Sequence, residues 1–180
     1  MTLNDIIVSA LAQLDRGHDA QTLDIWRDKF TRFANDGVTD LAEAYQPRAT
    51  EAYESADGLL DTLSLSRPCV KLLSVTRSGK AEVFTPGPRS GTVLLPGGPG
   101  QVQVAYRYLP APMQTPSDVP DLPEWCHGLI VCYVVGRERA AGDVSLQRGG
   151  NIYFQMYEAG KANLRPHVGE ADSYCLLNRW

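Results

Sequence analysis

The sequence predicts an α+β fold, mainly a helical bundle of about four helices, with an inserted small antiparallel β-sheet and an extended C-terminal tail. Three observations lead to this prediction. Apolar residues recur at helical spacing near both ends of the chain, a period of two dominates its middle, and neither period continues after Pro166. With 180 residues, of which 43% are hydrophobic and 21% charged, the chain has the composition of an ordinary globular domain.

Two helices are expected in the N-terminal part of the chain. An apolar stripe behind Thr2, a residue type that is common at helix N-caps, predicts a short amphipathic helix over residues 3–14. A second stripe predicts a longer helix that begins at about Thr22 and ends before Pro47. Aromatic residues at this spacing, such as Trp26, indicate core packing rather than a cofactor site.

The middle of the chain is expected to form the β-sheet. Clusters of Gly and Pro separate short runs of β-type residues, and these residues supply turns. In the last run, apolar residues alternate with polar ones from Val102 to Tyr108, as in a strand that buries one face. The predicted strands cover residues 70–76, 80–84, 92–95 and 101–108.

The C-terminal part returns to helix after a proline-rich connector. A helix is expected over residues 123–140, and Gly142-Asp143 predicts the corner of an antiparallel helix pair whose second member begins at that Asp. All segments are expected to belong to one structural domain. They are the N-terminal helices (1–50), the inserted β module (51–110), the C-terminal helical pair that completes the bundle (111–165) and the extended tail (166–180).

Composition excludes several classes of protein. The chain begins without a basic segment followed by an apolar run, and no stretch approaches the ~20 apolar residues of a membrane span, so neither secretion nor membrane insertion is expected. Cys69, Cys126, Cys132 and Cys175 form no CxxC motif, which favours reduced thiols. A net charge of -4 argues against a protein whose main task is to bind nucleic acid.

Charge is unevenly distributed along the chain. Residues 1–52 carry five positive and nine negative charges, whereas residues 67–108 carry six positive charges and one negative. The basic residues of the second segment are candidates for a patch that faces DNA in a lumen or an acidic neighbouring subunit, although solvated strand faces are the more common explanation of such residues. These residues are Arg67, Lys71, Arg77, Lys80, Arg89 and Arg107.

The sequence contains no recognisable catalytic motif. Walker loops, nucleophile elbows, HExxH sequences, EF-hand loops and Rossmann fingerprints are all missing, so we expect no catalytic residue, metal or cofactor. One arrangement stays open as an alternative, a small thiol-dependent enzyme that uses Cys126, His127 and a distant carboxylate. Against it, an apolar neighbourhood raises the pKa of a thiol and makes it inert, which favours core packing for this cysteine.

The order of elements resembles that of phage head-to-tail adaptor proteins, also called connector, neck or head-completion proteins, including the tail-tubular adaptors of short-tailed phages. The resemblance spans nearly the whole chain. It rests on the opening helix and the aromatic start of the second, on a strand that feeds a proline-bounded helix, and on the final helical pair. The matching segments are residues 3–14, 26–30 with Asn35, 102–110, Asp118 with 121–127, and 142–158.

This resemblance implies a non-enzymatic virion protein of the phage neck, assembled in the host cytoplasm. It implies a dodecameric ring that binds the portal protein on one side and a tail or stopper (nozzle) protein on the other, with transient contacts to the DNA that is ejected through its lumen. The C-terminal residues expected to dock on the portal or a neighbouring subunit are Tyr174, Leu176, Leu177, Arg179 and Trp180. Alternatives are a neck stopper or tail-completion protein, the thiol enzyme, and a nucleic-acid-binding module.

Overall fold

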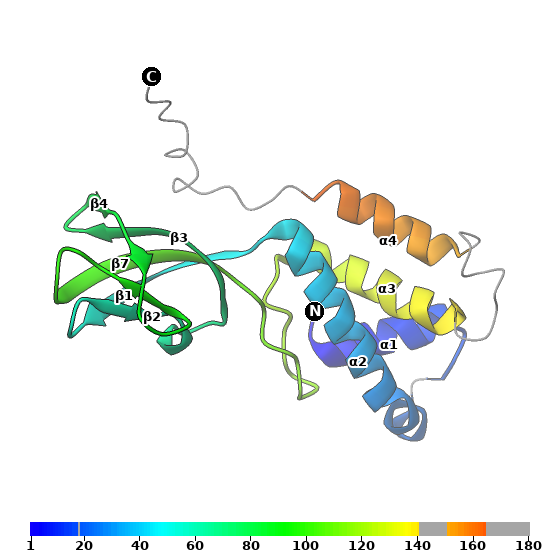
Figure 1. Ribbon diagram of the computed structural model, residues 1–180. Helices are drawn as coiled ribbons and strands as arrows, with labels where there is room; N and C mark the ends of the chain where they lie inside the picture. Colours follow the sequence, from blue (N-terminus) through cyan, green and yellow to red (C-terminus); the bar gives the residue numbers. More distant parts are fainter. Residues whose placement is uncertain (18, 141–150, 165–180) are drawn as a thin grey trace. The chain divides into compact units, whose positions relative to one another are not determined.

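The computed structural model describes residues 1–17, 19–140 and 151–164, which form two compact units (Figure 1). A helical unit is built from Met1–Tyr45 together with the described part of residues 110–165. A β unit is built from Gln46–Leu109. The first unit therefore combines segments from both sides of the second in sequence.

The helical unit contains four α-helices within the described residues. They are α1 (Leu3–Gln13), α2 (Ala20–Tyr45), α3 (His127–Ala140) and α4 (Ile152–Ala162), with the short 3-10 helix η2 (Glu124–Cys126) just before α3. Helix α3 packs against the other three (Figure 1). It therefore buries residues around most of its circumference, whereas α1 and α2 each bury one stripe.

Side-chain caps explain where the helices begin. At the start of α1, the Thr2 hydroxyl accepts the backbone N–H of Asp5 while the Asp5 carboxylate accepts that of Thr2, a complete capping box that confirms the predicted helix start. Asp19 accepts backbone N–H groups at the start of α2. Asn151 does the same for α4, while the predicted corner at Gly142-Asp143 lies outside the described residues.

The β unit consists of two antiparallel sheets. The four-stranded sheet has the order β1-β7-β3-β4, and the three-stranded sheet has the order β2-β6-β5. The first sheet contains β1 (Arg48–Ser55), β7 (Gly100–Tyr108), β3 (Cys69–Arg77) and β4 (Lys80–Glu82). The second contains β2 (Leu59–Asp61), β6 (Thr92–Leu94) and β5 (Thr85–Pro86), with the 3-10 helix η1 (Thr62–Ser64) after β2.

Strand β7 organises the core of the β unit. It pairs with β1 on one side and β3 on the other, and its alternate residues from Val102 to Tyr108 are buried, as the sequence predicts. They pack against Leu60, Leu65, Val75 and Leu95, which come from both sheets and the connections between strands. The chain enters and leaves this unit side by side, because Arg48 pairs with Arg107 and Tyr108 donates its backbone N–H to Pro47 O at 3.1 Å.

The prediction of a mainly helical bundle with a single small sheet is wrong. Of the described residues, 44% are helical and 24% lie in strands, and these strands form two sheets, one of them with four strands. The protein is α+β, with a β unit that has a core of its own. The predicted extended tail, residues 166–180, lies outside the described residues.

The missing strands explain the error. The sequence of β1 resembles a polar loop because its inward residues include the carboxylate of Glu51 and the hydroxyl of Ser55. Strands β2 and β5 contain three and two residues, too few to show a period. Of the predicted strands, those at 70–76, 80–84 and 101–108 belong to the four-stranded sheet, and the run at 92–95 corresponds to β6 in the other sheet.

Candidate functional site

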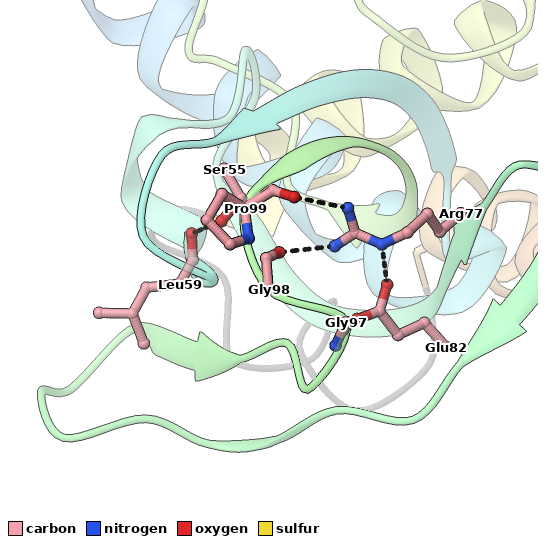
Figure 2. Close-up of polar contacts among 7 residues, drawn as sticks. All are labelled: Ser55, Leu59, Arg77, Glu82, Gly97, Gly98 and Pro99. Atoms are coloured by element: carbon pink, nitrogen blue, oxygen red, sulfur yellow. Dashed lines mark hydrogen bonds and ion pairs between the residues drawn. The ribbon is translucent and has the colours of Figure 1, made fainter.

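Arg77 at the end of β3 binds three groups at once (Figure 2). Its Nε donates to Glu82 Oε2 at 2.9 Å, its Nη1 to Pro99 O at 3.1 Å and its Nη2 to Gly98 O at 2.8 Å. Glu82 in turn accepts the backbone N–H of Gly97 at 2.7 Å. The guanidinium therefore joins the β3–β4 hairpin to the Gly-Pro turn before β7, and each of its three nitrogens donates a hydrogen bond within the β unit.

The turn is built for this contact. A Cβ on Gly97 would lie 2.6 Å from Glu82 Oε1 and 2.9 Å from Arg77 Nε, closer than side chains approach one another. The hydrogen bond from Arg77 holds the pKa of the Glu82 carboxyl below its ordinary value, against the opposing effect of burial. The sequence predicts that residues 96–100 form an exposed turn. In the structure this turn also accepts hydrogen bonds from Arg77, and Gly97 leaves room for the Arg77 and Glu82 side chains.

The other predicted basic residues are spread over the β unit. Lys71 and Arg107 are cross-strand neighbours on β3 and β7, six residues or roughly 20 Å along β3 from Arg77. The guanidinium carbon of Arg67 lies 4.4 Å from the centroid of the Tyr108 ring. Two further residues are exposed in separate turns, Lys80 beside the β3–β4 turn and Arg89 between β5 and β6.

A second polar cluster lies at the edge of the core of the β unit. Glu51 accepts the backbone N–H of Ser66 at 2.9 Å, a hydrogen bond from the Ser66 hydroxyl, and the hydroxyl of Tyr106 at 3.3 Å. Burial raises the pKa of Glu51, but these hydrogen bonds and the nearby Arg67 outweigh it and leave the pKa below its ordinary value. An inward carboxylate is thereby kept ionised and satisfied within the sheet.

In the helical unit, one carboxylate joins three elements. Glu138 on α3 accepts from Arg16 Nη2 at 2.9 Å and pairs with Lys29 Nζ of α2 at 2.7 Å, while its side chain is only 8% exposed. The Arg16 guanidinium carbon lies 3.8 Å from the centroid of the Trp26 ring. Because Arg16 follows α1 directly, this network fixes the α1–α2 connection to α3.

Another carboxylate joins α4 to α2. Asp40 accepts both the hydroxyl of the buried Tyr157 and two hydrogen bonds from Lys161 Nζ, at 2.7 and 2.6 Å. Burial and the neighbouring carboxylate raise the pKa of the Tyr157 hydroxyl far above its ordinary value, so this group remains a hydrogen-bond donor. The cluster therefore anchors α4 to α2.

Cys126 and His127, the residues of the thiol-enzyme alternative, are both buried. Burial raises the pKa of the Cys126 thiol to about 11. His127 is buried and contacts other groups, since its Nε2 lies 3.0 Å from Leu122 O and its Nδ1 lies 3.0 Å from the N-terminal amine of Met1. The geometry therefore supports core packing for both residues.

The β unit also contains a cavity with a polar lining. This cavity of about 480 Å³ is lined by the β3–β4 turn and the start of β7, with hydroxyl, amide and Arg77 side chains but no carboxylate, imidazole or thiol. Within residues 1–17, 19–140 and 151–164, no three His, Cys, Asp or Glu side chains gather in a way that could hold a metal ion. In the same ranges no helix combines the length and apolarity that a membrane crossing requires.

The five predicted docking residues at the C-terminus, Tyr174 to Trp180, lie outside the described residues. The structure instead reveals ion-pair networks around Glu138 and Asp40, which sequence reasoning missed. The paired residues are more than 100 positions apart in sequence, as in Arg16–Glu138 and Asp40–Lys161. No local sequence pattern could therefore predict these pairs. Lys29 and Asp40 have no spacing that distinguishes them from other polar residues on α2.

Comparison with known proteins adds no family: no protein-family model matches this sequence, and no curated protein matches it. The function is therefore inferred from the residues themselves, their order and their contacts.

Proposed function

We propose that this protein is a structural head-to-tail adaptor of a tailed phage, which forms a ring that joins the portal to the tail and lets DNA pass. The observation that carries the proposal is the order of elements. Two helices precede a β unit and two follow it, so that both ends of the described chain contribute to one helical unit while the β unit is an insertion between α2 and α3. This order is the one on which the resemblance to adaptors rests.

The contacts support a structural rather than a catalytic role. The polar clusters of both units tie elements together, with Arg77 joining a hairpin to a turn, Glu138 joining α3 to α2, and Asp40 joining α2 to α4. Cys126 and His127, the residues on which a thiol enzyme would depend, are buried in separate interactions. A protein whose task is to hold a fixed shape within an assembly needs such ties and no reaction centre.

The proposed partners are the portal protein, a tail or stopper protein, and eleven further copies of the chain in a dodecameric ring in the neck of the virion. The protein is also proposed to make transient, non-specific contact with the DNA that passes through the ring. A closed ring uses two different faces of each subunit, which must match each other. The apolar C-terminal residues from Tyr174 to Trp180 are proposed to dock on the portal or on a neighbouring copy, since Trp and Tyr are typical anchors of interfaces.

Purified full-length chain mixed with the portal of the same phage provides the test. Negative-stain imaging and native mass spectrometry are expected to show a ring of this protein bound to the portal ring. A chain that never associates with portal over a wide range of protein concentrations contradicts the proposal. If instead it binds only to portal that already carries another neck protein, it acts as a stopper.

Deleting residues 167–180 tests the proposed docking segment. The truncated chain is expected to keep its helical circular dichroism and to lose portal binding, because the anchor residues are gone while the described units are intact. A chain of equal length with the same fourteen residues in scrambled order is the matched control. It separates loss of the specific sequence from loss of chain length, and full binding by the truncated protein would show that the tail is not the anchor.

A further inference from the structure

Cations and aromatic rings contact one another in succession on the helical unit. We call this set the cation–aromatic surface; it consists of Arg16, Trp26, Lys29, Phe33 and Arg137, and we include Arg139 of α3, whose own ring contact is to Tyr153. Lys29 Nζ lies 5.2 Å from the centroid of the Trp26 ring and 5.7 Å from that of Phe33. The Arg137 guanidinium carbon lies 5.3 Å from the Phe33 centroid, so shared rings connect cations from different elements.

Positive charge dominates this surface. Among the described residues, the carboxylate that forms ion pairs with these cations is Glu138, whose 8% exposed side chain contacts both Arg16 and Lys29. Arg137 and Arg139 are exposed, and neither forms an ion pair with another residue in the described ranges. A net excess of positive charge therefore faces solvent on a unit whose N-terminal segment is otherwise acidic.

The cations are also held in place. Arg139 Nη2 donates to Gln13 O at 3.3 Å while its guanidinium carbon lies 4.9 Å from the Tyr153 ring centroid. Arg137 contacts both Phe33 and Tyr133. Side chains that are already restrained by ring contacts lose less conformational freedom when they bind a partner. The surface is thus prepared for anionic groups at fixed positions.

We infer that the cation–aromatic surface binds the phosphate backbone of duplex DNA without regard to sequence. This inference deepens the proposed function, because it assigns the DNA contact of the adaptor to the helical unit. Phosphate recognition requires positive charge and little else, and it is the main source of non-specific DNA affinity. An interface with an acidic protein would in addition require an exposed apolar centre, whereas Trp26 and Phe33 are half-buried and lie beside the cations of this surface.

The β unit is a weaker candidate for this contact despite its greater positive charge. Each nitrogen of the Arg77 guanidinium already donates one hydrogen bond within the β unit, to Glu82, Pro99 or Gly98. The exposed residues Lys80 and Arg89 lie in separate turns and share no ring or acid that would group them. Phosphates spaced along one backbone are matched better by the cations Arg16, Lys29 and Arg137, which shared rings link in succession.

Binding of the full-length chain to a fluorescently labelled 30-base-pair duplex of mixed sequence tests the inference. Fluorescence anisotropy is measured between about 50 and 200 mM salt, where log Kobs falls with log salt by about 0.9 for each phosphate neutralised. The Arg137→Gln/Arg139→Gln variant removes two exposed cations. Its slope is expected to become shallower by about 1.8, with weaker binding at every salt concentration.

Two matched variants decide whether the location is correct. Lys80→Gln/Arg89→Gln removes the same charge from the β unit and is expected to bind like the original protein, while Arg137→Lys/Arg139→Lys keeps the charge and is expected to retain the slope. Equal losses from both glutamine variants would point to overall charge and overturn the inference. So would loss in the lysine variant, undetectable DNA binding by the original chain, or binding of poly-glutamate in preference to DNA.

The assay separates this inference from the adaptor proposal, because it requires neither portal nor a ring. If rings form on portal while the slope is the same for all variants, the DNA surface is wrong and the adaptor stands. If the slope changes as expected but no portal is bound, the DNA surface stands and the adaptor proposal fails. Circular dichroism of each variant confirms that the helices are intact.

Discussion

At the scale of single residues, one arginine side chain in the β unit holds two separate segments together by hydrogen bonds. Arg77 bridges a hairpin and a glycine-rich turn through one carboxylate and two carbonyl groups, with a side chain that is 24% exposed. A planar guanidinium can satisfy three acceptors in this geometry, whereas a lysine ammonium cannot reach them in the same plane. The residue therefore fixes the position of the turn before β7.

Replacing Arg77 with Met is expected to destabilise the β unit by about 2 to 3 kcal/mol, because hydrogen bonds to charged groups are lost and Glu82 keeps only a backbone donor. Lys80→Met is the matched control, an exposed cation three positions away whose loss is expected to change stability by less than about 0.5 kcal/mol. Hydrogen exchange of β3 and β7 amides measures the unfolding free energy of this unit. Equal protection in the two variants would contradict the assigned role.

The pH dependence has a defined sign. The folded pKa of Glu82 lies below its ordinary value of 4.5, so this carboxylate contributes stability above that pH and loses the contribution as the pH falls through the folded pKa. Since Arg77 is the main cause, Arg77→Met should remove most of this acid sensitivity. The original protein and the variant are therefore expected to converge in exchange rate as the pH falls below 4.5.

The thiol of Cys126 gives a second residue-scale prediction. With a pKa of about 11, only about one thiol in 10,000 is ionised at pH 7, and the side chain is buried as well. Labelling with a maleimide in the native state is expected to be slow at Cys126, to accelerate with alkaline pH, and to become fast in urea. Cys69, which is partly exposed, serves as the internal comparison. Fast native labelling at Cys126 would revive the thiol-enzyme alternative.

At the scale of elements, α3 shows how glycine permits close helix packing. A Cβ on Gly136 would lie 3.1 Å from Phe154 Cγ of α4, closer than ordinary van der Waals contact. A Cβ on Gly128, in the first turn of the same helix, would meet nothing within 4 Å. The two glycines therefore have different roles. Gly136 leaves space for the Phe154 ring, whereas Gly128 only lowers the helix propensity of α3.

Substitution of these glycines by Ala is expected to act in opposite directions. Gly136→Ala should destabilise the helical unit by about 1 to 3 kcal/mol, because Phe154 has to move in a packed interface. Gly128→Ala should stabilise it by about 0.5 to 1 kcal/mol through helix propensity. Thermal unfolding followed by circular dichroism measures both changes. A stabilised Gly136→Ala protein would show that α4 can shift away from α3 without loss.

The elements also show how far sequence reasoning extends. Amphipathic periods and caps predict α1 and α2 to within a few residues, and strict alternation predicts β7. The same reasoning misses β1, because its inward Glu51 is satisfied by Ser66 and Tyr106, which lie 15 and 55 positions away. It also treats residues 96–100 as turn residues alone. The steric reason for a glycine at position 97 is the nearby side chain of Glu82, which is distant in sequence. Long-range polar partners leave no local pattern.

At the scale of the whole molecule, the two units are joined in sequence by a pair of neighbouring strands. Strands β1 and β7 are antiparallel along their whole length, from Arg48–Arg107 to Ser55–Gly100, so the two ends of the β unit lie about 5 Å apart. Each unit contains its own buried apolar residues. The β unit therefore has the properties of an insertion that can be removed.

Replacing residues 46–109 with a glycine-serine linker of about four residues is expected to leave a chain that keeps its α-helical circular dichroism and a cooperative thermal transition. The isolated segment 46–109 is expected to fold as a β protein, with dispersed amide resonances in its NMR spectrum. A linker chain that is molten would contradict the independence of the helical unit. Wrong linker length is excluded by repeating the measurement with a linker about twice as long.

The adjacent entry and exit of the β unit also have an evolutionary consequence. Substitutions, insertions and even replacement of the residues between Pro47 and Tyr108 leave the spacing at the attachment point unchanged, as long as the β1–β7 pair is kept. Selection can thus act on one unit without requiring compensating changes in the packing of the other. We expect relatives of this chain to vary most in the turns of the β unit, and to retain the helical network around Glu138 and Asp40.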